Sequence, residues 1–333
     1  MRFARYRTPD GATTTGLVVG PAGQERVHAL RSAVALVELA AAGPDATGEA
    51  ARWAATSSPA VPVGDVHLLP PLDPPSVRDF VTFEEHVEGV RRSIDGEGGV
   101  VPAWYEAPTF YFTNPHSLVG AHDDVAVPPG CRALDFELEV AAVVGRGGSN
   151  LRPEDAERDV FGYTVFNDWS ARDLQRREMA VNLGPAKGKD FATTLGPWVV
   201  TPDELEEFRD ADGYLALELR AFVDGDLVGQ DLASNAGWTF GEMIAYASRG
   251  TTVRPGDVLG SGTCGNGGCL AELWGRRGRQ DPPPLAPGQV VRLEVQGIGA
   301  VANRVVPGPD LADLPTVPPA RVRSRARTTR SSS

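Results

Sequence analysis

Two glutamates stand two residues apart at the start of an apolar stretch of this sequence. The segment Leu134–Val140 alternates apolar and acidic residues and continues as an uninterrupted apolar run. Side chains two apart on a β-strand share a face, so Glu137 and Glu139 are predicted to point the same way. Partly buried carboxylates repel each other and lose hydration, so the pair needs a cation. The alternative is an amphipathic edge strand with a solvated acidic face.

A second polar group follows the predicted strand at residues 163–168. Asp168, Arg172 and Gln175 fall within a narrow arc if the chain continues as a helix. An acid, a guanidinium and an amide on one side make a plausible binding wall. The alternative is a capped surface helix that carries an i,i+4 ion pair.

An aspartate and a histidine recur at helical spacing earlier in the chain. Phe83, Val87 and Val90 predict a helix, with Asp79 as its N-cap. Asp79 and His86 are seven residues apart, which is two helical turns and therefore one face. Without further context, a capped helix with a surface histidine explains the same pattern.

Lysine is used very selectively. Of 32 basic residues only Lys187 and Lys189 are lysines, and they share one Gly/Pro-rich loop. This choice indicates that a compact ammonium matters there. The loop lacks the spacing of a phosphate-binding P-loop.

Composition excludes several classes of protein. The net charge of −12 argues against nucleic acid as a partner. No apolar run is long enough to cross a bilayer, and no secretory signal is recognisable at the N-terminus, so a cytoplasmic location without membrane attachment is expected. Cys131, Cys264 and Cys269 are too few for a disulfide scaffold and are expected to be plain thiols.

Short strands and turns predict an α+β, mainly β, protein in three parts. Residues 1–70 are expected to form a small N-terminal domain, separated by a proline-rich linker over 59–75. Residues 71–308 would form the main domain, with a hairpin turn at Asp224-Gly225. Residues 309–333, rich in Arg and Ser, are predicted to be disordered.

Together these segments resemble the fumarylacetoacetate hydrolase family over about residues 77 to 306. The strongest motifs are Asp135-Phe136-Glu137-Leu138-Glu139, Asn167-Asp168-Trp169-Ser170-Ala171-Arg172-Asp173-Leu174-Gln175 and Gly188-Lys189-Asp190-Phe191. Several such motifs in the right order are specific, whereas each alone is not. The resemblance implies a mixed β-roll or sandwich and a homodimer.

The resemblance also assigns roles to individual residues. As metal ligands it implies Asp79, Glu137, Glu139 and Asp168. As catalytic residues it implies His86, Lys189 and Glu272, the last on a late strand and paired with the histidine. As substrate-binding residues it implies Arg172, Gln175 and Thr263.

The implied activity is metal-dependent hydrolysis of a C–C bond in a small anionic 1,3-dicarbonyl acid, in aromatic amino acid catabolism. An all-oxygen site suits Mg²⁺ or Ca²⁺, with Mn²⁺ possible. Two departures leave alternatives open. Smaller relatives carry a glutamate where this chain has Gly89, and segment 264–269 is shorter than in fumarylacetoacetase. A decarboxylase or keto–enol isomerase of a 2-oxo acid is the first alternative, and a silent Ca²⁺-stabilised binding protein is the second.

Overall fold

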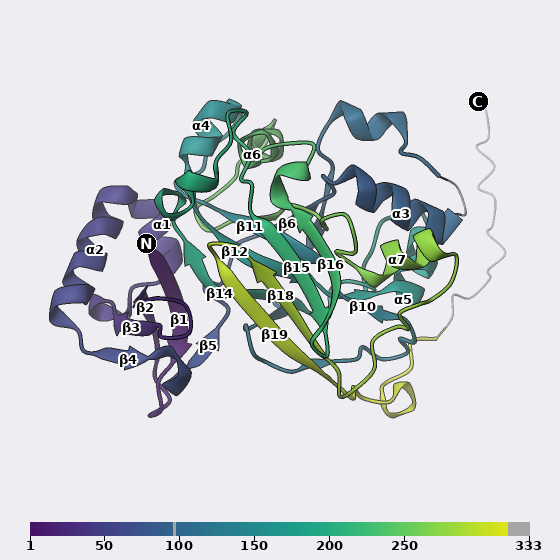
Figure 1. Ribbon diagram of the computed structural model, residues 1–333, viewed down its shortest axis with the longest axis horizontal. Helices are drawn as coiled ribbons and strands as arrows, with labels where there is room; N and C mark the ends of the chain where they lie inside the picture. Colours follow the sequence, from purple (N-terminus) through teal and green to yellow (C-terminus); the bar gives the residue numbers. More distant parts are fainter. Residues whose placement is uncertain (96–97, 319–333) are drawn as a thin grey trace, which may run out of the picture.

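A large mixed sheet is the framework of the protein. The computed structural model describes residues 1–95 and 98–318, and twelve strands of these residues form one sheet (Figure 1). Its strand order is β4-β3-β2-β1-β14-β12-β11-β17-β6-β7, with β5 beside β1 and β8 beside β14. The strands are β1 (Arg2–Arg7), β2 (Thr13–Val19), β3 (Arg26–Ala29), β4 (Ala60–Pro62), β5 (His67–Leu69), β6 (Val77–Phe80), β7 (Phe110–Thr113), β8 (Leu118–Val119), β11 (Leu138–Val144), β12 (Val160–Asp168), β14 (Thr193–Val200) and β17 (Val258–Gly260).

The centre of this sheet is buried on both faces. Every residue of β11, β12 and β14 is buried, which explains why the run after Glu139 is continuously apolar rather than alternating. Burial on both faces requires a second layer of structure over the sheet. The acidic residues at the strand ends are therefore anchored in a rigid core.

A smaller sheet packs over the first. Among the described residues it has five strands in the order β16-β15-β18-β19-β9. They are β9 (Val125–Ala126), β15 (Glu218–Val223), β16 (Asp226–Leu232), β18 (Val290–Val295) and β19 (Gly299–Val306), and a separate pair joins β10 (Leu134–Asp135) to β13 (Ser170–Ala171). Both sheets contribute to one hydrophobic core, and Figure 1 shows β15, β18 and β19 in front of β12 and β14. The mainly β prediction is confirmed, and the expected turn at Asp224-Gly225 joins β15 to β16 with both residues at positive φ.

Helices cover the edges and ends of the sheets. They are α1 (Leu36–Ala42), α2 (Pro44–Ser57), α3 (Glu84–Asp95), α4 (Pro153–Arg158), α5 (Arg172–Met179), α6 (Phe240–Ser248) and α7 (Leu270–Arg277). Helices α3 and α7 lie side by side (Figure 1), and their backbones meet at two glycines. A Cβ on Gly275 would lie 2.0 Å from the carbonyl oxygen of Gly89. Only glycine permits so close a crossing.

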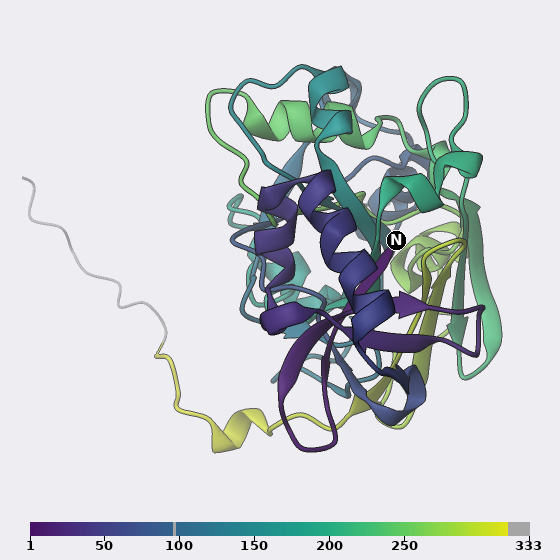
Figure 2. The same cartoon turned by 90° about the vertical axis from the view of Figure 1, so that its left-hand side faces the viewer.

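The N-terminal region extends the central sheet. Strand β1 pairs with β14 through Arg2 opposite Val200 and Phe3 opposite Val199. Phe3 also shares a core cluster with Val143 of β11. Figure 2 shows α1 and α2 packed together over the N-terminal strands. An independent domain over residues 1–70 is thus not confirmed, and the proline-rich segment contains strands β4 and β5. The strand pairing was missed because it joins positions nearly two hundred residues apart.

The C-terminal segment is described only in part. Residues Leu311–Asp313 form a 3₁₀ turn. The remainder of the predicted disordered tail, from residue 319, lies outside the described residues, so that prediction stays untested.

Candidate active site

Three acids from two separate segments of the chain meet at the centre of the site. Asp79, Glu137 and Glu139 each offer a carboxylate oxygen, and these oxygens lie within 4.8 Å of one another. Glu139 stands on β11, and Glu137 occupies the break between β10 and β11, where its N–H donates to Asn167 Oδ1 at 2.9 Å. The prediction that the two glutamates face the same way is consistent with this geometry.

Asp79 reaches the site from a strand rather than from a helix. It belongs to β6, opposite Gly260 of β17 and opposite Tyr111 of β7. Helix α3 begins only at Glu84. The predicted N-cap role and the shared helical face with His86 were therefore wrong. The helical periodicity was real but started later, because pairing with two neighbouring strands fixes Asp79 in the sheet.

The backbone at Gly260 lies against two of these acids. A Cβ added to Gly260 would lie 2.8 Å from Glu139 Oε2 and 3.0 Å from Asp79 Oδ1. The buried oxygens Asp79 Oδ1 and Asp168 Oδ1 have no hydrogen-bond partner. A buried carboxylate oxygen without a partner is unfavourable unless a proton or a cation satisfies it. The residues present fit a divalent ion held by oxygen ligands.

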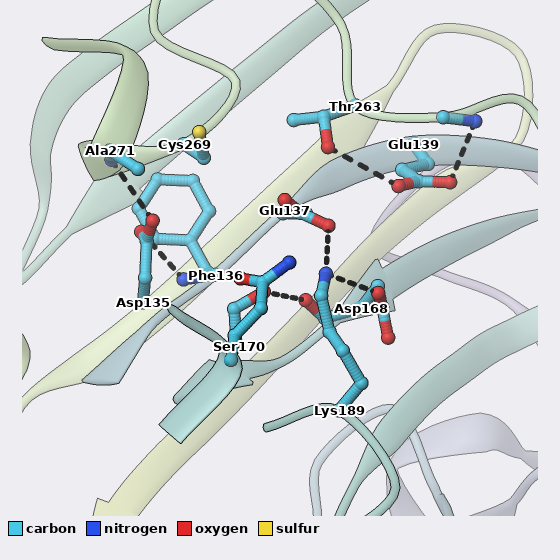
Figure 3. Close-up of polar contacts among 12 residues, drawn as sticks. Asp135, Phe136, Glu137, Glu139, Asp168, Ser170, Lys189, Thr263, Cys269 and Ala271 are labelled. Atoms are coloured by element: carbon cyan, nitrogen blue, oxygen red, sulfur yellow. Dashed lines mark hydrogen bonds and ion pairs between the residues drawn. The ribbon is translucent and has the colours of Figure 1, made fainter. Parts of the chain in front are cut away.

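Lys189 links this triad to Asp168, the fourth predicted ligand. Its Nζ lies 2.5 Å from Glu137 Oε2 and also donates to Asp168 Oδ2 (Figure 3). Burial acts to lower the pKa of Lys189, but the charges of Asp168 and Glu137 outweigh it and raise that pKa. Lys189 is thus a fixed ammonium. Lys187, by contrast, is exposed and pairs with Asp190.

Arg172, the first residue of α5, is held by three side chains. Its Nε donates to Asp135 Oδ2 at 2.8 Å, its Nη2 to Glu137 Oε1 at 2.7 Å and its Nη1 to Gln175 Oε1 at 3.2 Å. The structure therefore brings Arg172 and Gln175 together, as predicted. A guanidinium has five N–H donors, so two remain for another ligand.

Negative charge exceeds positive charge in this buried cluster. Five carboxylates surround two permanent cations, Arg172 and Lys189, which leaves an excess of three; the acids are Asp79, Asp135, Glu137, Glu139 and Asp168. Burial first, and then neighbouring acids, raise the pKa of Asp79 and of Glu139 well above their usual values. Burial also acts to raise the pKa of Glu137, but Lys189 and Arg172 outweigh it and lower that pKa. The raised pKa values belong to Asp79 and Glu139, two of the three acids whose oxygens could hold one ion.

His86 is buried on α3 and is neutral near pH 7. Burial lowers its pKa to about 4, and the charges of Arg172 and Lys189 act in the same direction, against that of Glu137. Its Nδ1 lies 3.7 Å from Cys269 Sγ. A neutral imidazole in an acidic, buried setting can accept a proton.

Glu272 lies in helix α7, so its predicted position on a strand was wrong. Its Oε1 pairs with Arg276 Nη2 at 2.6 Å, and its Oε2 accepts from Gly267 N–H at 3.3 Å. Burial raises its pKa to about 7, although Arg276 lowers it. Within residues 1–95 and 98–318, the polar contact of the His86 ring is with Cys269 and not with Glu272.

Thr263 touches a predicted metal ligand. Its Oγ1 lies 3.4 Å from Glu139 Oε1, while Gly262 N–H donates to Glu139 Oε2 at 2.9 Å (Figure 3). Both contacts hold the Glu139 carboxylate in one orientation. The structure places Thr263 beside the acids, and its predicted contact with substrate stays a prediction.

The sequence interpretation missed three residues of the site. Tyr111 donates its hydroxyl proton to Asp168 Oδ2, beneath Lys189. Asp135 accepts from Arg172 and from the N–H groups of Leu270 and Ala271. Cys269 contacts His86. Only Asp135 had a signal in the sequence, since it opens the acidic motif; the other two depend on pairing between distant segments.

Fold and site together define a mainly β protein with a buried acidic cluster of the kind that holds a divalent metal. Residues 76–306, more than half of the chain, match the family model described as "Fumarylacetoacetate (FAA) hydrolase C-terminal". The chain therefore belongs to the fumarylacetoacetate hydrolase family, which confirms the resemblance.

Relatives within this family carry different activities in their names. A fumarylacetoacetase of Arabidopsis thaliana is 32% identical over 254 residues, which cover 62% of this chain and 60% of that protein. A mitochondrial oxaloacetate tautomerase of Xenopus laevis is 35% identical over 190 residues, 57% of this chain and 55% of that protein. The matched region thus spans about 60% or less of these two relatives.

Solved structures share the fold. A fumarylacetoacetate hydrolase from Exiguobacterium antarcticum has a TM-score of 0.69 and 24% identity, covering 92% of this chain and all of that one. A maleylpyruvate hydrolase from Sphingobium, solved with manganese(II) and pyruvate, has a TM-score of 0.67 and 22% identity, covering 93% of this chain and all of that one. In the described residues no helix is both long enough and apolar enough to cross a membrane.

Proposed function

We propose that this protein is a divalent-metal-dependent hydrolase that cleaves a C–C bond in a small anionic 1,3-dicarbonyl acid of the acylpyruvate or fumarylacetoacetate type. The observation that carries the proposal is the combination of a neutral buried His86 with the Lys189-bridged acids. A proton acceptor and a fixed ammonium are the two groups that hydrolysis of a carbonyl compound requires.

The four acids Asp79, Glu137, Glu139 and Asp168 would hold the cation, for which Mg²⁺, Ca²⁺ and Mn²⁺ are the candidates. A bound divalent cation supplies Lewis-acid polarisation of the two dicarbonyl oxygens and neutralises charge on the leaving enolate. Oxygen ligands favour these hard ions over zinc. Asp168 is included in this set because it is fully buried and its Oδ1 has no hydrogen-bond partner.

The chain's own residues account for the proton and charge movements. His86 takes a proton from water, and the resulting hydroxide adds to the carbonyl carbon remote from the acid group. Lys189 uses two N–H groups on Glu137 and Asp168, so its third can donate to the developing oxyanion. The C–C bond then breaks, its electron pair forms the enolate, and the proton on His86 returns to carbon.

Arg172 and Gln175 would bind the acid group of the substrate. Two N–H donors of Arg172 are free after its contacts with Asp135, Glu137 and Gln175. Charge-assisted donors suit a carboxylate. Thr263 would line the same region, and Glu272 would support α7 beside His86.

A tautomerase acting on a 2-oxo acid is the second candidate, because the Xenopus relative carries that name. Enolisation needs the same charge stabilisation but no hydrolytic water. The test is turnover of a panel of acylpyruvates, fumarylacetoacetate and oxaloacetate, followed by loss of enol absorbance and by identification of products. Release of two acids from a dicarbonyl substrate, lost in His86→Ala, supports the hydrolase. Interconversion of oxaloacetate tautomers without bond cleavage overturns it in favour of the tautomerase. The proposed homodimer is tested separately by its mass in solution.

A further inference from the structure

Among the described residues, Cys269 makes the only polar contact with the ring of His86. Its Sγ is 3.7 Å from His86 Nδ1 and accepts from the backbone N–H of Glu272 at 3.4 Å. The side chain is fully buried. The sulfur therefore joins the predicted base on α3 to the first turn of α7.

The position of this sulfur is fixed from two sides. Cys269 is the N-cap residue of α7, and its extended backbone directs Sγ to the third N–H of the helix. The first two N–H groups, of Leu270 and Ala271, donate to Asp135 at 2.8 and 3.0 Å. Asp135 is itself fixed by Arg172. All three leading N–H groups of α7 are thus satisfied by buried side chains, and Sγ has little freedom to move away from His86.

We infer that Cys269 is a positioning residue that accepts a hydrogen bond from His86 Nδ1–H and so leaves Nε2 free as the proton-accepting nitrogen. The inference rests on the proposed role of His86 as the base. Which ring nitrogen carries the proton is set by the hydrogen bond that the other nitrogen leaves available. A ring that carried its proton on Nε2 would have no lone pair there to accept another, and its basic nitrogen would be Nδ1, which faces Cys269.

The chemistry of the thiol supports this assignment. Burial raises the pKa of the Cys269 thiol well above its usual value, so the sulfur stays neutral and does not compete with His86 as a base. The sulfur of a neutral thiol is a weak acceptor and its S–H is a weak donor, so the tautomer measurement below decides between acceptance from Nδ1–H and donation to Nδ1. Glu272 carries its side chain to Arg276 instead, so the carboxylate is not the immediate partner of the ring.

The test is the tautomeric state of His86, read from ¹⁵N shifts in histidine-labelled, Mg²⁺-loaded full-length protein. The chain has five histidines, and His86→Gln assigns the resonance. The wild type is expected to show Nδ1–H. Cys269→Ala is expected to shift His86 towards Nε2–H and to lower kcat by about 10–100-fold, the range for a residue that orients a reacting group. Cys269→Ser, which keeps an acceptor and the cap, should retain the Nδ1–H form and most of kcat.

Cys264→Ala is the matched control. Cys264 is equally buried and lies in the same loop, but its backbone N–H donates to Leu138, and among the described residues the hydrogen-bond partner of the His86 ring is Cys269. It should leave the tautomer and kcat unchanged. A wild-type His86 in the Nε2–H form overturns the inference, and this reading does not require any Cys269 variant to fold. A wild-type tautomer in Cys269→Ala overturns it as well. If the tautomer shifts as expected while no dicarbonyl acid is cleaved, the positioning role stands and the proposed hydrolase function fails.

Discussion

Gly260→Ala should weaken cation binding without a mutation in any ligand. The added Cβ would stand 2.8 Å from Glu139 Oε2, closer than real Cβ contacts allow, and 3.0 Å from Asp79 Oδ1, which is tighter than most such contacts. Glu139 cannot simply turn away, because Gly262 N–H at 2.9 Å and Thr263 Oγ1 at 3.4 Å hold its two oxygens. Displacing one ligand in this way is expected to lower affinity by about 10–100-fold, as loss of ligand orientation does elsewhere.

The loss of cation affinity can be measured through its effect on thermal stability. A cation present at one hundred times its Kd stabilises the folded wild type by about 2.7 kcal/mol. For a chain of this size that corresponds to a rise in Tm of about 4 °C relative to the chelated protein. A 100-fold loss of affinity would reduce the stabilisation to about 0.4 kcal/mol and nearly abolish the rise.

The assay is thermal unfolding by circular dichroism at several Mg²⁺ and Mn²⁺ concentrations, with calorimetric titration for Kd. Gly64→Ala is the matched control, since a Cβ there meets no atom within 4 Å. It should keep the full cation-dependent rise. The reasoning is refuted if Gly260→Ala binds the cation as tightly as Gly64→Ala, or if chelation leaves the wild-type Tm unchanged.

Three further predictions concern the charged groups around the acids. Lys189→Met leaves the buried Asp168 without its cation and Glu137 with Arg172 alone, so the free energy of unfolding should fall by about 3–5 kcal/mol and turnover by at least about 10²-fold. Exposed Lys187→Met should change neither, and equal behaviour of the two variants in urea unfolding would contradict this. His86 has a folded pKa of about 4 against about 6.5 unfolded, so the unfolded state binds more protons between these values and stability falls as pH drops from 6.5 towards 4. His86→Gln should remove up to about 2 kcal/mol of the wild-type loss between pH 6.5 and 5, and an unchanged pH profile of unfolding would show that the ring is not buried neutral. Arg172→Lys keeps the charge but cannot contact Asp135, Glu137 and Gln175 together, so KM for the dicarbonyl acid should rise by about tenfold or more; a KM equal to that of the wild type would exclude Arg172 from substrate binding.

The sequence was most informative where the site and the local structure coincide. Glu137, Glu139 and Lys189 could be identified because they lie in short motifs that also determine their surroundings, a strand start and a glycine-rich loop. The continuous apolar run after Glu139 correctly indicated a core strand. These are local signals, readable within about ten residues.

The errors arose where distant pairings decide the structure. Asp79 was assigned to a helix because Phe83 begins a true helical periodicity, but β17 and β7 pair with it from both sides. Glu272 was placed on a strand because a short apolar run suits either element. The helix that contains Glu272 is capped by Asp135, which accepts from the N–H of Leu270. Asp135 precedes Leu270 by 135 residues. No local pattern records that contact.

The crossing of α3 and α7 explains how Gly89 can replace the glutamate expected there in smaller relatives. A Cβ on Gly89 would lie 2.4 Å from Glu272 Cγ, so the space for a side chain at 89 is occupied by Glu272 itself. A side chain at position 89 and the side chain of Glu272 therefore compete for the same space. Ala in place of Gly within a helix normally stabilises by about 0.5–1 kcal/mol, but overpacking costs about 1–3 kcal/mol. Gly89→Ala should consequently lower the free energy of unfolding.

The effect of Gly89→Ala on the free energy of unfolding should change sign once the Glu272 side chain is shortened. In Glu272→Ala the Cγ atom is absent, and the remaining Cα and Cβ lie at 3.4 Å from the new methyl group, a contact that small shifts can relieve. Gly89→Ala should then be neutral or stabilising, which gives a coupling free energy of at least about 1 kcal/mol between the two sites. Urea unfolding of the wild type, both single variants and the double variant measures this cycle. Additive effects would show that α3 and α7 separate easily, and that Glu272 does not fill the position that a residue 89 side chain would take.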